Sequence, residues 1–354
     1  MKFLFAFTFI FCGVMLNAQN IPLYVGTYTG EDSEGIYFYN FNQETGKLSH
    51  KTLAIKTENP SYIAYSKNRK FIYAVGEVAN FNNTNSGFVS AFSVAENGNL
   101  QFINTVSSNG AHPCHIELNG ENVAISNYTG GTISIHKIEK NGIIKPAFQI
   151  IDHNTPNQKS HAHSTQFIDN ELFVADLGRD FLSEYVKKND SYFLKENYSM
   201  KPTSGPRHFE ISRNKKFIYI INEYSSTVTV LKRAGKNYTE IQNASTLADD
   251  FIGSSSGADI HLSENETYLY GSNRGENSIV VFKRDATNGT LEKIQNSPVM
   301  GNWPRNFTIS PNGQFLLVAN QYSKNISVFK IASDSGKLIY EYSLQTPTPV
   351  CLLF

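Results

Sequence analysis

The chain has 354 residues and carries 31 basic and 31 acidic residues, so its formal net charge is zero. This balance provides no basic surface for nucleic acid or for an anionic membrane, and we expect neither as a partner. No stretch beyond the N-terminus is apolar and long enough to span a bilayer.

The N-terminus has the features of an export signal. Lys2 gives it a positive start, the apolar run Phe3–Phe11 follows, and Leu16-Asn17-Ala18 provides a cleavage site that ends in a small residue. The apolar run is too short for a membrane anchor. We therefore expect residues 1–18 to be a signal peptide, residues 19–354 to form one domain, and the protein to be periplasmic or secreted.

One pattern of two apolar strands recurs along the rest of the chain. The second strand of each copy ends in a polar pair, as in Val75-Gly76-Glu77, Ser126-Asn127-Tyr128, Ala175-Asp176-Leu177, Ile221-Asn222-Glu223, Ser272-Asn273-Arg274 and Ala319-Asn320-Gln321. A seventh copy, Val25-Gly26-Thr27, begins the mature chain without its first strand. Copies spaced by about 45–50 residues are typical of a β-propeller with one four-stranded blade per repeat. We therefore predict an all-β, seven-bladed propeller.

The predicted strands follow in the same order in each copy. First strands are expected to begin near Pro60, Pro113, His161, Pro206, Gly257 and Pro304. Strands such as Thr132–His136 alternate apolar and polar residues, and Asn288-Gly289 favours a hairpin turn. The last segment, residues 348–354, resembles another first strand. We expect it to complete the N-terminal blade and close the ring, which removes exposed sheet edges.

Two cysteines, Cys114 and Cys351, remain after the predicted cleavage. Export favours disulfides, but the repeat places these two residues on first strands of blades that are not neighbours. We therefore expect two buried free thiols.

Polar positions of the repeat are predicted to meet at one face of the ring. A first strand begins at the face where the antiparallel second strand ends, so both positions lie around the mouth of the central channel. First strands contribute the pairs Ser61-Tyr62, Cys114-His115, Ala162-His163, Arg207-His208, Ala258-Asp259, Arg305-Asn306 and Val350-Cys351. Second strands contribute Glu77, Tyr128, Asp176, Glu223, Arg274 and Gln321.

These positions include three histidines, three arginines and several carboxylates. Arginine binds carboxylate or phosphate through two parallel hydrogen bonds. Histidine transfers protons near neutral pH, and a carboxylate beside arginines stays ionised and orients water. The set predicts an anion-binding acid–base site, although propeller channels commonly carry polar residues that bind only water and each other.

Other motifs give weaker signals. His161-x-His163 has a spacing that metal ligands use on a strand. No cysteine cluster or carboxylate motif accompanies it, so we expect no metal and no cofactor. Ser164 would point to the opposite face of its strand from His163. Trp303 and the many other aromatic residues are expected to pack blades together.

Several longer motifs are more specific together than any short motif alone. They are His112-Pro113-Cys114-His115, His161-Ala162-His163-Ser164, Asp176-Leu177-Gly178-Arg179-Asp180, Gly205-Pro206-Arg207-His208, Asn222-Glu223, Ser272-Asn273-Arg274-Gly275 and Pro304-Arg305-Asn306-Phe307. In these motifs the chain resembles the seven-bladed lactonase family, which includes bacterial propeller-type 6-phosphogluconolactonases and fungal carboxymuconate-lactonising enzymes. The resemblance extends from Tyr24 to the C-terminus.

The resemblance implies a lactonase and a set of site residues. The family's proposed catalytic set corresponds to His163, Arg207, Glu223 and Arg274, with His161 as the less favoured histidine. The arginines would bind the anionic group of the substrate and stabilise the oxyanion. Either Glu223 or His163 would deprotonate water, and the other would protonate the leaving oxygen. The rest of the pocket would consist of His115, His161, Asp176, Arg179, His208, Asn273 and Arg305.

The implied partner is a small, anionic lactone, and we expect a monomer. Because 6-phosphogluconolactone is a cytosolic metabolite, either the N-terminus is not an export signal or the substrate is another sugar or aldonic lactone met outside the cytoplasm. Two other functions stay open. One is an exported propeller that binds an anionic sugar or a protein without catalysis. The other is an enzyme that forms a lactone from an unsaturated dicarboxylate with the same arginines.

Overall fold

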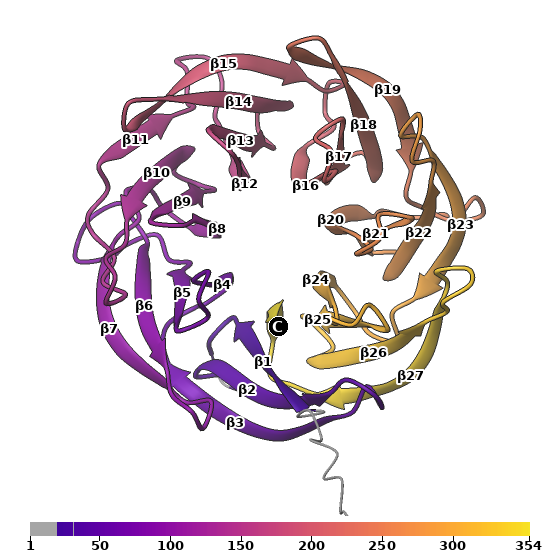
Figure 1. The fold of residues 1–354 in the computed structure, drawn as a ribbon, viewed down its shortest axis with the longest axis horizontal. Coiled ribbons are helices and arrows are strands. Elements are labelled where there is room, and N and C mark those ends of the chain that lie inside the picture. Colours follow the sequence, from indigo (N-terminus) through magenta and orange to yellow (C-terminus); the bar gives the residue numbers. More distant parts are fainter. Residues whose placement is uncertain (1–19, 31) are drawn as a thin grey trace, which may run out of the picture.

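The computed structural model describes residues 20–30 and 32–354, which form seven four-stranded antiparallel sheets arranged in a ring (Figure 1). The predicted signal peptide lies outside the described residues. Within them no helix occurs, and thus none that is long and apolar enough to cross a membrane. The predicted all-β, seven-bladed propeller is confirmed.

Each sheet has one strand at the central channel and three strands successively farther out (Figure 1). The sheet that closes the ring, which we call the closure sheet, contains from the centre outward β28 (Pro349–Leu353), β1 (Asn20–Thr27), β2 (Gly35–Asn42) and β3 (Leu48–Lys56). The next three sheets contain β4 (Ile63–Tyr65), β5 (Phe71–Gly76), β6 (Phe88–Val94) and β7 (Leu100–Ser107); β8 (Pro113–Asn119), β9 (Asn122–Asn127), β10 (Thr132–Lys137) and β11 (Gln149–Asp152); β12 (Ala162–Ile168), β13 (Glu171–Asp176), β14 (Phe181–Lys188) and β15 (Ser191–Ser199). The last three contain β16 (Pro206–Ile211), β17 (Phe217–Asn222), β18 (Thr227–Ala234) and β19 (Asn237–Ser245); β20 (Ser256–Leu262), β21 (Tyr268–Arg274), β22 (Ser278–Arg284) and β23 (Leu291–Pro298); β24 (Pro304–Ile309), β25 (Phe315–Asn320), β26 (Asn325–Ile331) and β27 (Leu338–Gln345).

The second strand of a sheet is apolar because neighbouring sheets cover both of its faces. In β17 and β25 every residue is buried, whereas β27 at the rim is mostly exposed. Tight turns at the strand ends need glycine where φ is positive. Gly98 lies in such a turn, with a φ of 82°. An added Cβ at this position would also lie only 2.6 Å from the ring of Phe38.

The two ends of the described chain share one sheet. β28 pairs antiparallel with β1, with Leu352 opposite Val25 and Cys351 opposite Gly26. Leu352 N also donates to Asn306 Oδ1 of the neighbouring sheet at 2.7 Å. The prediction that the last segment completes the N-terminal blade is confirmed.

Cys114 and Cys351 are both free and buried, as predicted. Cys114 Sγ donates to the backbone oxygen of His163 at 3.3 Å. Cys351 Sγ lies 4.0 Å from the backbone oxygen of Ile63. Both thiols thus help to pack inner strands of neighbouring sheets.

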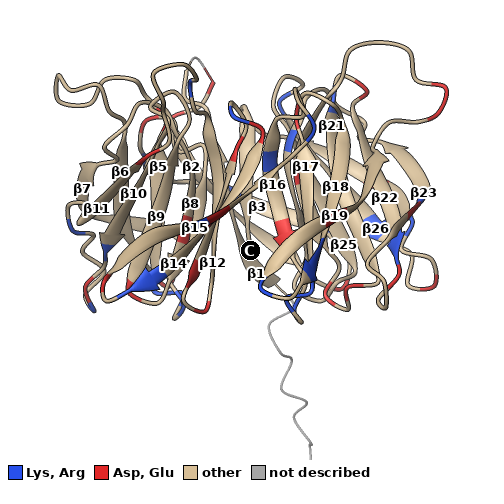
Figure 2. Cartoon of the chain, turned by 90° about the horizontal axis from the view of Figure 1, so that it is seen from above, with Lys and Arg blue, Asp and Glu red and all other residues tan. Residues whose placement is uncertain are grey.

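Inner strands begin, and second strands end, at one face of the ring, which we call the mouth face. The loops between sheets, and those between second and third strands, belong to this face because successive strands alternate in direction. Seen edge-on in Figure 2, the ring is a short, thick cylinder with loops protruding from both faces. Side chains of the candidate site therefore come from strand ends and loops of one face.

Candidate active site

A β-bulge interrupts six of the seven inner strands near the mouth face in the described chain. On β12 the pairing shifts between Ala162 and Ser164, so His163 has no partner. The corresponding unpaired residues of the other strands are Cys114, Arg207, Ala258 with Asp259, Arg305 and Val350. A bulge breaks the alternation of side chains and re-aims the extra residue. The repeat therefore places His163, Arg207 and Arg305 at equivalent positions of three sheets.

This register differs by one residue from the alignment that the sequence suggested for one blade. The alignment matched His163 with His208, whereas the pairing makes His163 equivalent to Arg207. In this blade Ala162 stands where most inner strands begin with proline. Ser164 Oγ donates to the backbone oxygen of Arg207 at 2.7 Å, so it anchors the next sheet.

Glu223 binds two arginines through one oxygen at the mouth. Its Oε2 accepts Arg207 Nε at 3.0 Å and Arg274 Nη2 at 2.8 Å. Burial raises the pKa of Glu223, but the charges of Arg274 and Arg207 outweigh burial and hold the pKa below its ordinary value. Glu223 is therefore ionised at neutral pH and is a weak base.

The start of β20 fixes both arginines from the other side. Arg207 Nη1 donates to the Ala258 carbonyl at 2.6 Å, and Arg274 Nη2 donates to the Gly257 carbonyl at 2.8 Å. Burial lowers the pKa of both arginines, that of Arg274 to about 10, so both remain cations at neutral pH. Arg207 Nη2 and Arg274 Nη1 have no acceptor within the described residues, which leaves them available to a ligand.

His163 is a buried, neutral imidazole beside these arginines. Burial, followed by the charges of Arg207 and the neighbouring His208, lowers its pKa well below the ordinary value. Its ring lies 5.1 Å from the ring of His208. Nδ1 is completely enclosed and has no partner in the described chain, whereas Nε2 is not enclosed. Nε2 is thus the nitrogen that can exchange a proton at the mouth.

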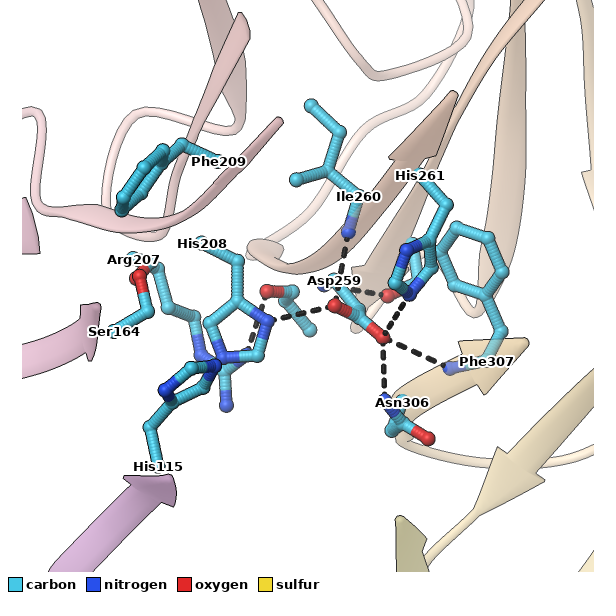
Figure 3. A network of polar contacts seen from close by, with 12 residues as sticks. His115, Ser164, Arg207, His208, Phe209, Asp259, Ile260, His261, Asn306 and Phe307 are labelled. Carbon is cyan, nitrogen blue, oxygen red and sulfur yellow. Dashed lines mark hydrogen bonds and ion pairs between the residues drawn. The ribbon is translucent and has the colours of Figure 1, made fainter. Parts of the chain in front are cut away.

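His208 belongs to a buried chain of polar groups below the arginines (Figure 3). Its Nε2 lies 3.3 Å from Arg207 Nη1, and its Nδ1 lies 2.6 Å from Asp259 Oδ1. His261 Nε2 approaches the other oxygen of Asp259 at 3.1 Å, and His261 Nδ1 lies 2.9 Å from Glu210. Burial lowers the pKa of His208 to about 4. His208 is therefore neutral, donates from Nδ1 and presents Nε2 to Arg207.

His115 lines the same part of the channel. Its ring lies 4.3 Å from the ring of Tyr62 and 5.6 Å from that of His208. Its Nδ1 accepts a hydrogen bond from Thr165 N at 3.4 Å. Burial lowers its pKa well below the ordinary value, so His115 is a neutral wall of the site.

Arg305 approaches the mouth from β24 with a different set of neighbours. Its guanidinium lies 5.1 Å above the ring of Tyr28, and Tyr28 donates to Glu77 Oε2 at 2.8 Å. Arg305 Nη2 is 3.7 Å from the same carboxylate oxygen, which is too far for a hydrogen bond. The charge of Arg305 lowers the pKa values of His163 and Glu223. Arg305 therefore lies near the central cluster, by which we mean His163, Arg207, Glu223 and Arg274.

Asp176 and Asn273, both predicted to bind substrate, occupy a buried position of the repeat. Each pairs with the residue before the bulge, as Asn222 does with Pro206. Asp176 is fully buried and accepts from His153 Nδ1, Ser160 Oγ, His161 N and Arg179 N. Asn273 is also fully buried and donates to Thr246, Glu276 and Ser278. Both side chains support mouth loops from behind.

His161 and Arg179 lie on the mouth face beside the central cluster. The ring of His161 stacks on Tyr128 at 4.4 Å, and its Nδ1 lies 3.0 Å from the Tyr128 carbonyl. Arg179 Nη1 donates to the His153 carbonyl at 2.6 Å, and the guanidinium lies over the ring of Phe181. No ion pair joins either residue to Glu223 in the part of the chain that is described.

Sequence patterns alone missed two aromatic residues of the site. Trp303 was expected to pack blades, but its ring lies 5.3 Å from the Arg274 guanidinium and 4.8 Å from the stacked ring of Tyr322. Tyr28 lies under Arg305. Trp303 precedes a proline, as Gly205 does, and this shared place in the repeat was the available signal.

No group of three or more potential metal-binding side chains occurs among residues 20–30 and 32–354.

The family model described as "Lactonase, 7-bladed beta-propeller" matches residues 22–354, and the chain belongs to this family. The resemblance seen in the motifs is confirmed.

Two relatives and two solved structures match almost the whole chain. A 6-phosphogluconolactonase of Bacillus subtilis (strain 168) is 32% identical and covers 94% of this chain and 97% of its own. One from Formosa agariphila is 35% identical, with 89% and 94% covered. A Bacteroides fragilis protein has a TM-score of 0.87 at 33% identity, with 96% and 98% covered. A periplasmic gluconolactonase of Pseudomonas aeruginosa has a TM-score of 0.87 at 29% identity, with 94% and 98% covered.

Proposed function

We propose that this protein hydrolyses a sugar or aldonic-acid lactone at the mouth of its channel. The observation that carries the proposal is the pair of buried arginines sharing one oxygen of Glu223 beside the neutral His163. Relatives that match almost the whole chain and bear the name 6-phosphogluconolactonase support this class of reaction.

His163 is the base in this proposal, and Glu223 orients the arginines. The Oε2 atom of Glu223 is already occupied by contacts with Arg207 and Arg274, so this carboxylate holds the arginines in place. His163 has a free, uncharged Nε2. A base of this kind contributes about 100- to 10,000-fold to a reaction rate.

The reaction then proceeds in two balanced steps. Water gives a proton to His163 Nε2 while its oxygen attacks the lactone carbonyl. The resulting oxyanion accepts hydrogen bonds from Arg207 Nη2 and Arg274 Nη1, an effect worth about 100- to 1000-fold per donor. The ring C–O bond breaks, and the imidazolium returns its proton to the leaving oxygen, which yields a hydroxy acid.

Export and a monomeric state belong to the same proposal. A mature chain that begins at Gln19, detected by mass spectrometry in the periplasm or medium, would support export. An uncleaved chain that stays in the cytoplasm would contradict it. Size-exclusion chromatography with light scattering tests the monomer.

The hydrolase is tested with the purified mature chain, residues 19–354. Acid release from δ-gluconolactone and from 6-phosphogluconolactone is followed above the spontaneous rate. His163→Asn and Glu223→Gln should abolish most of this release while thermal unfolding stays close to that of the parent. The matched control is His50→Asn, because His50 is exposed on the outer strand β3.

Three arginines at one mouth also favour a second candidate, since an unsaturated dicarboxylate needs two cationic partners. This enzyme would form a lactone, and the loss of diene absorbance of cis,cis-muconate measures it. A folded protein that turns over neither kind of substrate would contradict both enzymatic functions and favour a binding role.

A further inference from the structure

The residues around the mouth come from two different halves of the ring. His163, Arg207, Glu223 and Arg274 are supplied by three consecutive sheets, which begin with β12, β16 and β20. Arg305, Tyr28 and Glu77 are supplied by the next three, which begin with β24, β28 and β4 (Figure 1). A ligand in the mouth would therefore contact the acid–base group on one set of sheets and Arg305 on the other.

The three arginines differ in how many of their donors the protein uses. Arg207 and Arg274 each donate to Glu223 and to a backbone carbonyl. Arg305 makes no hydrogen bond to any described residue, and its closest carboxylate oxygen is 3.7 Å away. Its side chain is 18% exposed, and none of its nitrogens is enclosed. Arg305 thus offers an open guanidinium fork at the mouth.

The neighbours of Arg305 lie close to it without occupying its donors. The guanidinium carbon lies over the ring of Tyr28, 5.1 Å from the ring centre. Glu77 Oε2 is already bound by the Tyr28 hydroxyl, which weakens its competition for Arg305. Such a fork fits the two oxygens of a carboxylate or a phosphate.

The charges at the mouth favour an anion as well. The cations are Arg207, Arg274 and Arg305, and the facing carboxylates are Glu223 and Glu77. One positive charge is left over in this set. Since an uncompensated cation is costly in a partly buried site, an anionic ligand would stabilise it.

We propose that Arg305 binds an anionic substituent of the substrate, a phosphate or a carboxylate. This rests on the proposed function for the lactone ring, but the anion site itself does not depend on turnover. Arg305 is in this view the residue that determines specificity for charged over neutral lactones.

Calorimetric binding of stable sugars tests the anion site without any reaction. The probes are glucose 6-phosphate, glucuronate and glucose, which carry a phosphate, a carboxylate and no charge. We expect at least one charged probe to bind more tightly than glucose. Arg305→Gln should weaken that probe about 10- to 100-fold, the range of a charge-assisted hydrogen bond, and should leave glucose unchanged.

The pattern across the probes decides the outcome. Preference for only one charged probe would identify the anion as phosphate or carboxylate. Equal binding of all three probes, or equal weakening of all three in Arg305→Gln, would overturn the proposal. Arg213→Gln is the matched control, because Arg213 lies in the turn after β16 at the opposite face and donates to the Glu264 carbonyl.

Two further measurements separate this proposal from the hydrolase. Arg305→Lys keeps the charge but loses the fork and should restore part of the binding. Acid release by Arg305→Gln should show a larger rise in KM for an anionic lactone than for a neutral one. A protein that binds the charged probes through Arg305 but hydrolyses nothing would retain the anion site and lose only the proposed reaction.

Discussion

His208 donates from Nδ1 to Asp259 at 2.6 Å, and this contact ties the inner strand β16 to β20. The Asp259 carboxylate accepts five hydrogen bonds in all, from His208, Ile260, His261, Asn306 and Phe307 (Figure 3). Since Asn306 and Phe307 belong to β24, one buried carboxylate joins three consecutive sheets below the mouth.

Asp259→Ala should therefore destabilise the whole ring. The substitution leaves buried donors on three strands without an acceptor, and breaking a buried charged network costs about 3–5 kcal/mol. Urea unfolding measures the loss, with the exposed Asp250→Ala as the matched control. An unfolding free energy equal to that of the control would show that Asp259 does not carry this network.

The acid limb of activity is predicted to lie below the ordinary histidine range. The pKa of His163 is lowered well below 6.5, first by burial and then by Arg207, His208, Arg305 and Arg274. Because the neutral imidazole is the base, kcat/KM should rise with pH through this low pKa and then level off.

Arg305→Gln tests the cause of this shift with a neutral lactone. Removal of one cation near His163 should move the acid limb to higher pH, whereas Arg213→Gln should leave it in place. An acid limb that stays fixed in Arg305→Gln would contradict His163 as the base, or its contact with this charge.

The fold was predictable because each blade repeats the same short pattern. The polar endings such as Asn222-Glu223 and Asn273-Arg274 recur with a spacing that depends only on local strand and turn lengths. The closure by residues 348–354 followed from a missing first strand at one end and an extra one at the other.

The site was predictable only in part, because its geometry depends on contacts between sheets. Equivalent positions brought Arg207, Glu223 and Arg274 together without knowledge of any distance. For the blade that contains His163, the sequence alignment was wrong by one residue, because the position of a bulge depends on strand pairing that the sequence does not show. The local sequence also does not show which aromatic ring lies beside which arginine, because these residues are far apart in the chain. Trp303 was therefore predicted to pack blades, although its ring lies beside Arg274.

Glu117 is predicted to make stability fall as pH rises. Burial, together with the nearby charge of Glu210, raises the pKa of Glu117 from 4.5 to about 8. Between these two pH values the folded chain therefore binds more protons than the unfolded chain. The free energy of unfolding falls as the pH rises through this window. Glu117→Gln should flatten the thermal unfolding temperature over this window. A slope equal to that of the parent would contradict the raised pKa.

Deletion of residues 348–354 should prevent formation of a stable ring. It removes β28, exposes the edge of β1 and takes away the Leu352 contact with Asn306. Yield of soluble protein and thermal unfolding measure the effect. The matched control is a short Gly-Ser extension after Phe354, which leaves β28 in place. A truncated protein as stable as the extended one would show that closure is dispensable.

Trp303 is predicted to increase activity through its contact with Arg274, although its own backbone conformation is strained. Its φ of 67° is a left-handed conformation that a bulky residue adopts only under constraint. Its ring contacts the Arg274 guanidinium, an interaction worth about 1–2 kcal/mol in a partly buried site. Loss of this support should lower kcat/KM, and a phenyl ring should replace part of it.

Trp303→Gly distinguishes this role from simple packing. Glycine relieves the backbone and matches Gly205, which precedes the proline of β16 at φ 67°. We expect kcat/KM to fall about 5- to 30-fold, as the loss of that cation–π contact implies, with an intermediate value for Trp303→Phe. The unfolding temperature of Trp303→Gly should stay near that of the parent. A large loss of stability with unchanged kcat/KM would return Trp303 to the packing role that the sequence suggested.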